Sequence, residues 1–359
     1  MADGVLPDHT LRKMAAAGEI EALRPLDDDQ VQPASLDLRL GATAIRVRAS
    51  FLSGHGRSIE DRLAAFEMHR VSLEGDGAVL EKGCVYLVEL LESLALPEDV
   101  SAVANAKSST GRLDLLTRTI ADGGTEFDRI PAGYRGPLYA EICPRSFSVL
   151  AREGMRLNQI RFRRGHAALE DGALKALHEQ EPLVSGTAHI DQGLGFSVDL
   201  KLPATTLVGY RAKPHTGVID LARIGGHDRA DFWEEVHSDD GQIILDPGAF
   251  YILVSREAVT IPPDYAAEMA PYLAMVGEFR VHYAGFFDPG FGHAEAGGAG
   301  ARGVLEVRCH EAPFVLEHGQ IVGRLVYERM AARPERLYGA GLSSNYQGQG
   351  LKLSKHFKD

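Results

Sequence analysis

Leucine alternates with charged residues over 36–40, where the chain reads Leu-Asp-Leu-Arg-Leu. A period of two places alternate side chains on opposite faces of a strand, so we expect a half-buried β-strand within 31–41. A second run, Val-Tyr-Leu-Val-Glu-Leu-Leu at 85–91, is apolar almost throughout. This run predicts a more fully buried strand.

Short runs of this kind continue from 79 to 165, separated by glycine and proline. Regularly spaced short strands with such turns are typical of an all-β sandwich or barrel. Residues 114–120 fit a helix or a strand equally well. We therefore expect an all-β fold with few short helices.

Helical patterns occur in two other short stretches. Asp8 can cap a helix over 10–17 that Gly18 would end. Residues 166–183 are rich in Ala, Glu and Leu. They predict a linker that is helical or loosely structured.

The pattern of the first half returns in the second half. Leu-Glu-Lys-Gly-Cys-Val-Tyr-Leu at 80–87 matches Leu-Asp-Pro-Gly-Ala-Phe-Tyr-Ile at 245–252, and Leu-Pro-Glu-Asp at 96–99 matches Ile-Pro-Pro-Asp at 261–264. Both pairs share one shift of 165 positions (245 − 80 and 261 − 96). A repeat of this length predicts a tandem duplication with two similar domains, because it is far too long for a solenoid.

The length and charge agree with this organisation. The 359 residues suit two domains, which we place at 1–165 and 184–359, with the linker at 166–183 between them. The formal net charge of −12 argues against non-specific binding to nucleic acid. The three cysteines form no C-x-x-C pair, and neither a secretory signal nor a membrane span is visible. We therefore expect a reduced, cytoplasmic protein.

The stretch 107–112 concentrates hydroxyls, two cations and a glycine. Phosphate oxygens prefer hydroxyl and N–H donors beside a cation. Candidate phosphate ligands are therefore Lys107, Ser108, Ser109 and Arg112. The stretch is not a Walker loop, and an ordinary polar turn is the alternative that its spacing alone favours.

Two further features are candidates for a nucleotide site. The segment 283–291 contains an Asp-Pro-Gly turn among aromatic residues. These aromatic residues either form the bottom of a base or sugar pocket, or they flank an ordinary turn in which Asp288 faces solvent. Glu141 and Glu306 each lie within an apolar strand pattern. Such a carboxylate either faces solvent by alternation or occupies a pocket where its pKa is raised. A raised pKa would suit a general base near neutral pH.

The segment 338–350 is rich in glycine and contains two tyrosines. It predicts either a disordered end or a flap that closes over a ligand. The Cys-His-Glu at 309–311 lacks the spacing of zinc deaminases, and the fourteen histidines show no metal-ligand spacing. We therefore expect no protein-bound metal.

Together these motifs resemble those of the dCTP deaminases of the dUTPase-like superfamily, in the longer form with two fused copies. Members carry an [Arg/Lys]-Ser-Ser-x-x-Arg motif, matched at 107–112, and a hairpin ending Ile-Asp-Pro-Gly, matched by Phe-Asp-Pro-Gly at 287–290. They carry a strand glutamate, matched by both Glu141 and Glu306. Their tail has a Tyr and then Lys-Tyr-x-x-Gln, and the corresponding positions here are Tyr338, Asn345, Tyr346 and Gln349. The resemblance implies two tandem dUTPase-like, jelly-roll-like β-barrels.

The two copies depart from the family pattern in complementary ways. The second copy reads Pro-Tyr-Leu-Ala-Met at 271–275, where the phosphate motif would lie, and the first copy has a longer, altered hairpin at 121–131. In the single-copy family, sites form between neighbouring subunits. The resemblance therefore implies one composite site per chain or per pair of chains. The first copy would bind the phosphates, and the second would bind the base and supply the tail.

The activity that the resemblance implies is zinc-independent hydrolysis of dCTP to dUTP and ammonia, in pyrimidine deoxynucleotide biosynthesis. A glutamate, with Glu306 the first choice and Glu141 the second, would activate the water that attacks C4 of cytosine. Arg112 would stabilise developing charge, and backbone groups near Ala284 would contact the base edge. Mg²⁺ would accompany the triphosphate. A homo-oligomer is expected, without a nucleic-acid or membrane partner.

Two other functions remain open from the sequence. One is a bifunctional enzyme that also hydrolyses dUTP, or a pure dUTPase. The other is an inactive regulator that binds dCTP or dTTP. The products formed from dCTP would separate these possibilities.

Overall fold

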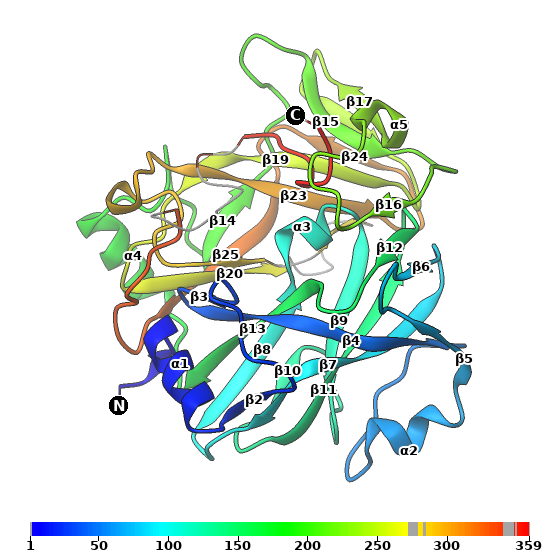
Figure 1. Cartoon of the computed structure of the whole chain (residues 1–359). Coiled ribbons are helices and arrows are strands. Elements are labelled where there is room, and N and C mark those ends of the chain that lie inside the picture. The colour runs from blue at the N-terminus through cyan, green and yellow to red at the C-terminus, as the bar shows by residue number, and fades with distance from the viewer. Residues whose placement is uncertain (1, 272–278, 283–284, 340–347, 349, 359) are drawn as a thin grey trace.

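The computed structural model describes residues 2–271, 279–282, 285–339, 348 and 350–358. Figure 1 shows two stacked lobes of strands, with the first half of the chain in the lower lobe and most of the second half in the upper lobe. Each lobe is a barrel-like arrangement of sheets around an apolar core, and the core of the first lobe continues into residues of the second half. The all-β fold with few short helices is as the sequence predicts. No described helix is long and apolar enough to cross a bilayer.

The elements are short and follow one another closely along the chain. The helices are α1 (Asp8–Ala16), α2 (Ile59–Leu63), α3 (Ser108–Gly111), α4 (Asp171–Gln180), α5 (Arg229–Phe232) and the 3₁₀ turn η2 (Ala294–Ala296). The strands of the first half are β1 (Gly4–Val5), β2 (Ile20–Ala22), β3 (Val31–Gln32), β4 (Ser35–Val47), β5 (Glu67–Ser72), β6 (Ala78–Leu80), β7 (Val85–Ala95), β8 (Val100–Ala106), β9 (Leu115–Ala121), β10 (Arg129–Ile130), β11 (Arg135–Pro144), β12 (Val149–Ala151) and β13 (Arg156–Arg164). Those of the second half are β14 (Leu194–Ser197), β15 (Leu207–Ala212), β16 (Ile219–Asp220), β17 (Trp233–His237), β18 (Gln242–Leu245), β19 (Phe250–Val259), β20 (Tyr265–Pro271), β21 (Phe279–His282), β22 (Phe286–Phe287), β23 (Ala301–Cys309), β24 (Phe314–Glu317) and β25 (Ile321–Arg329).

The two halves share a strand order. In the first, β7 pairs with β11 and β11 with β9, while β8 pairs with β13. In the second, β19 pairs with β23 and β23 with β21, while β20 pairs with β25. β7 begins at Val85 and β19 at Phe250, again 165 positions apart (250 − 85). This correspondence is what the predicted duplication would produce.

Strand β4 differs from the prediction in one respect that matters for the site. Its leucines are buried as expected, but Asp37 and Arg39 between them are also buried. Arg39 forms an ion pair with Glu92, and the carboxylate of Asp37 accepts from Lys107. The half-buried interpretation is therefore wrong, because period-two alternation alone does not distinguish a solvated polar face from an internally paired one.

The other local patterns have mixed outcomes. Residues 115–121 form strand β9, and helix α4 lies within the stretch predicted as a helical or loose linker. Asp8 does not cap α1, which begins at Asp8 and follows Pro7 without a side-chain cap. The buried carboxylate of Asp8 instead accepts from Arg12 and from the backbone N–H of Glu335.

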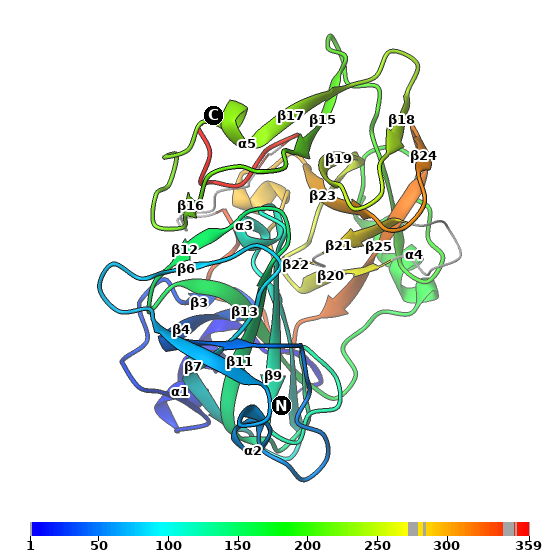
Figure 2. The same ribbon diagram turned by 90° about the vertical axis from the view of Figure 1, so that its right-hand side faces the viewer.

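The two lobes are joined beyond the linker. β16 of the second half pairs in parallel with β12 of the first, as Figure 2 shows near α3. Arg161 on β13 makes a second connection from a fully buried position. Its guanidinium donates to the carboxylates of Glu328 and Asp288 at 3.1 and 3.0 Å.

Replacing Arg161 is expected to destabilise the whole chain. Arg161→Met leaves the buried Asp288 without its cation and Glu328 with Arg163 alone. Breaking a buried pair typically costs about 3–5 kcal/mol. Urea denaturation should show this loss in the free energy of unfolding. Arg164→Met on the same strand is the matched control, because its pair with Asp99 lies at the surface and its loss should change stability far less. Equal changes in the two variants would contradict this role for Arg161.

Candidate active site

The stretch 107–112 folds as a single helical turn at the junction of the lobes. The N–H groups of Thr110 and Gly111 both donate to the carbonyl of Lys107, at 2.8 and 2.9 Å, which winds the chain into α3. Thr110, Gly111 and Arg112 are buried, whereas Lys107 and Ser108 are half-buried. This turn anchors its C-terminal side in the core and leaves polar groups on its N-terminal side available to a ligand.

Glu306 reaches the same place from the second half. It lies on β23 between two paired strands, and its side chain is buried. Arg112 faces this carboxylate, and its Nε lies 3.9 Å from Oε1 of Glu306. Burial raises the pKa of Glu306 to about 8, and Arg112 only partly opposes this shift. A carboxylate with a pKa near physiological pH is suited to accept and return a proton.

The Asp-Pro-Gly hairpin approaches from the same lobe. Asp288 is buried, and burial raises the pKa of its carboxyl against the opposing effect of Arg161. Gly290 has φ of +95°, and a Cβ there would lie 2.8 Å from Cβ of Leu337. Only glycine fits this approach without strain. The N–H of Tyr338 donates to the carbonyl of Pro289 at 2.8 Å, so the hairpin positions this tyrosine.

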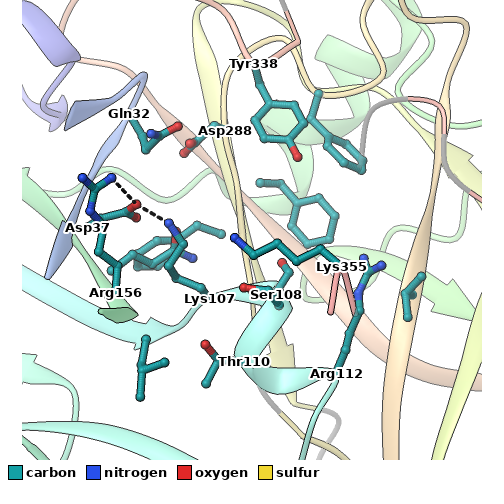
Figure 3. Close-up of a pocket in the computed structure, with 18 of the residues that line it drawn as sticks. Gln32, Asp37, Lys107, Ser108, Thr110, Arg112, Arg156, Asp288, Tyr338 and Lys355 are labelled. Carbon is teal, nitrogen blue, oxygen red and sulfur yellow. Dashed lines mark hydrogen bonds and ion pairs between the residues drawn. The ribbon is translucent and has the colours of Figure 1, made fainter. Parts of the chain in front are cut away.

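These groups surround one cavity of about 640 Å³ formed by both halves of a single chain. Figure 3 shows Lys107, Ser108, Thr110 and Arg112 on one side, with Asp288 and Tyr338 on the other. Seven of the residues proposed from the sequence line this cavity: Lys107, Ser108, Ser109, Arg112, Asp288, Glu306 and Tyr338. The cavity has the size of a small-molecule site, and phenylalanines as well as cations and carboxylates line it.

Comparison with known proteins identifies the family. Residues 2–166 match the "2'-deoxycytidine 5'-triphosphate deaminase (DCD) N-terminal domain" family, and residues 170–357 match the corresponding C-terminal domain family. The chain belongs to the dCTP deaminase family. The crystal structure of 2'-deoxycytidine 5'-triphosphate deaminase from Agrobacterium tumefaciens is 58% identical, with a TM-score of 0.88 over 92% of this chain and 100% of that one.

Curated relatives of the dCTP deaminase family align with less than half of the chain. A "dCTP deaminase" of Natronomonas pharaonis is 30% identical over 161 residues, which cover 44% of this chain and 79% of that protein. A "dCTP deaminase, dUMP-forming" of Sulfurihydrogenibium is 30% identical over 181 residues, 48% of this chain and 87% of that protein. This chain is an enzyme of the same family.

The second candidate base of this deaminase, Glu141, lies outside the cavity. It is buried on β11 and accepts from Nε of Arg118 at 3.1 Å. The guanidinium of Arg118 in turn stacks on Phe127, with its carbon 3.5 Å from the ring centroid. In the first half, the strand glutamate is therefore paired with an arginine of its own lobe, whereas Glu306 faces Arg112 from the other half.

The sequence did not point to several charged residues that line the deaminase cavity, among them Asp37, Arg156 and Lys355. Asp37 lies on β4 and pairs with Lys107, and Arg156 on β13 lies 3.9 Å from Asp37. Lys355 comes from the C-terminal segment. Alternation placed Asp37 in solvent, and nothing in the local sequence of the other two indicates a ligand.

Four residues proposed for the site lie outside the described part of the chain: Ala284, Asn345, Tyr346 and Gln349. The acidic loop 27–29 is exposed, and Asp28 and Asp29 also line the cavity. Within the described residues, no cluster of three His, Cys, Asp or Glu side chains has the arrangement of a metal site.

Proposed function

We propose that the chain hydrolyses dCTP to dUTP and ammonia in this cavity, with Glu306 as the general base. One observation carries the proposal: Glu306, with its raised pKa, lines the same cavity as the phosphate-binding candidates of α3. Lys107 and Ser108 would contact the triphosphate. The phenylalanine-rich side near Asp288 would take the nucleoside, and the substrate would enter with Mg²⁺ on its triphosphate.

The proposed chemistry needs one carboxylate to move protons. Ionised Glu306 takes a proton from a water molecule while the oxygen of that water bonds to C4 of cytosine. The protonated Glu306 then delivers a proton to N3, and transfer of a second proton from the new hydroxyl to the amino group releases ammonia and leaves uracil. Arg112 faces Glu306 and would stabilise negative charge that develops beside it. No zinc takes part in this proposal.

The experiment is incubation with dCTP and Mg²⁺, followed by identification of the nucleotide and of ammonia. The proposal expects dUTP and one ammonia per dCTP. Relatives named "dCTP deaminase, dUMP-forming" motivate a second candidate, for which dUMP and pyrophosphate would accompany ammonia. Binding of dCTP without ammonia release would favour the regulator and contradict the deaminase.

The pH dependence of the reaction follows from Glu306. Its pKa of about 8 means that the carboxyl is protonated, and unable to act as a base, at lower pH. We therefore expect kcat/KM, which reports the free enzyme, to fall about tenfold per pH unit as the medium is acidified below this pKa. A profile measured from about pH 6 to about pH 10 tests this. A kcat/KM that does not change across that interval would contradict the assignment.

A further inference from the structure

The C-terminal segment 351–358 returns from the second lobe to the phosphate motif of the first. Nη1 of Arg112 donates to the carbonyl of Lys352 at 3.1 Å. The hydroxyl of Ser354 donates to the carbonyl of Ser109 at 2.7 Å. The segment, red in Figure 2, therefore rests on α3 through specific hydrogen bonds on both sides of Leu353.

Apolar contacts hold the other side of this segment. Leu353 and Phe357 are buried in an apolar cluster to which both halves of the chain contribute. The ring of Phe357 lies 5.5 Å from that of Phe232 and 5.9 Å from that of Trp233, between centroids. His356 is also buried, and its Nε2 lies 3.1 Å from the carbonyl of Leu221. The segment is thus fixed at residues on either side of Lys355.

This anchoring directs Lys355 into the cavity. Figure 3 shows its side chain extending above Ser108 in the direction of Lys107. Three other cations of the cavity face carboxylates: Lys107 and Arg156 share Asp37, and Arg112 faces Glu306. Among the residues that the structure describes, no carboxylate lies within ion-pair distance of Lys355.

The electrostatic environment of Lys355 favours an incoming anion. Burial, and then the charge of Lys107, lower the pKa of its amino group, while Asp37 only partly opposes them. Two ammonium groups that face one cavity repel each other until an anion lies between them. A triphosphate supplies such an anion, because its oxygens can accept from both.

We propose that Lys355 is a substrate-binding residue that contacts the triphosphate together with Lys107 and Ser108. The C-terminal segment is then part of the binding site, because its docking on α3 places it beside the phosphate motif. This inference rests on the proposed function for the identity of the nucleotide. It adds a third cation that the phosphate motif itself does not contain.

The test measures binding without turnover, in the Glu306→Gln background, by calorimetry with Mg²⁺-dCTP and with deoxycytidine. Adding Lys355→Gln should weaken dCTP binding about 10- to 100-fold, the usual effect of losing a charge-assisted contact, and leave deoxycytidine binding unchanged. Lys355→Arg should restore most of the affinity. Lys358→Gln is the matched control, because this lysine lies on the same segment but pairs with Asp228 at the surface.

Two results would overturn the inference. Unchanged dCTP affinity in Lys355→Gln would show that the amino group makes no phosphate contact. Equal weakening for dCTP and deoxycytidine would show that the substitution merely displaces the segment. Ammonia release from dCTP by the unsubstituted chain, measured in parallel, tests the proposed function separately.

Discussion

Glu306→Gln should lower kcat for deamination of dCTP by about 10²- to 10⁴-fold, the range over which a positioned general base accelerates proton transfer. The amide keeps the size of the side chain and its place on β23 but cannot accept the proton of the attacking water. Since the phosphate contacts of α3 are untouched, binding of dCTP should persist. Steady-state ammonia release and calorimetric binding measure the two effects.

Glu141→Gln is the matched control for this variant. Glu141 is also a buried strand glutamate facing an arginine, but it lies outside the cavity. We expect its kcat to stay within about threefold of that of the unsubstituted chain, since the change should not reach the transition state. A large loss in Glu141→Gln together with full activity in Glu306→Gln would exchange the roles of the two residues.

Arg112→Ala should lower kcat by about 10²- to 10³-fold, the usual effect of removing one hydrogen-bond donor that stabilises charge developing in the transition state. It should also raise KM for dCTP. The guanidinium lies 3.9 Å from Glu306 and donates to the carbonyl of Lys352. Its loss therefore affects the base, the phosphate motif and the docking of the C-terminal segment together. Initial rates over a range of dCTP concentrations separate kcat from KM.

The matched control for Arg112→Ala uses the Arg118–Glu141 pair of the first lobe. Arg118→Ala combined with Glu141→Gln removes an arginine that also faces a strand glutamate, without leaving a buried charge unpaired. This double variant should keep kcat and KM near those of the unsubstituted chain. Equal loss of activity in the two arginine variants would contradict a specific role for Arg112.

The sequence predicted the fold because each strand signal is local. Alternation over 36–40 and the apolar run at 85–91 both became strands, and the shift of 165 positions anticipated the matching strand orders. Local patterns did not reveal that the polar face of β4 is buried. Asp37 becomes buried only when Lys107, seventy positions later, pairs with it.

The site was predictable where its chemistry lies in one motif. The residue types at 107–112 made phosphate binding one of two interpretations, and the resemblance added Asp288 and Tyr338. The structure brings these residues to one cavity. The sequence could not settle between Glu141 and Glu306, because both lie in the same strand pattern. They differ in which arginine faces them and in whether they line the cavity, and neither difference shows in the local sequence. Lys355 has no local signal, because its place depends on how the segment around it docks on α3.

The central claim is that one chain contains a complete site formed from both of its halves. The most direct test combines Arg112→Ala and Glu306→Gln chains, co-expressed with different tags and purified through both tags. Each chain then lacks one half of its own site. We expect ammonia release from dCTP to be no greater than the sum of the two separate variants. Recovery of substantial activity would place Arg112 and Glu306 of one site on different chains and contradict the account.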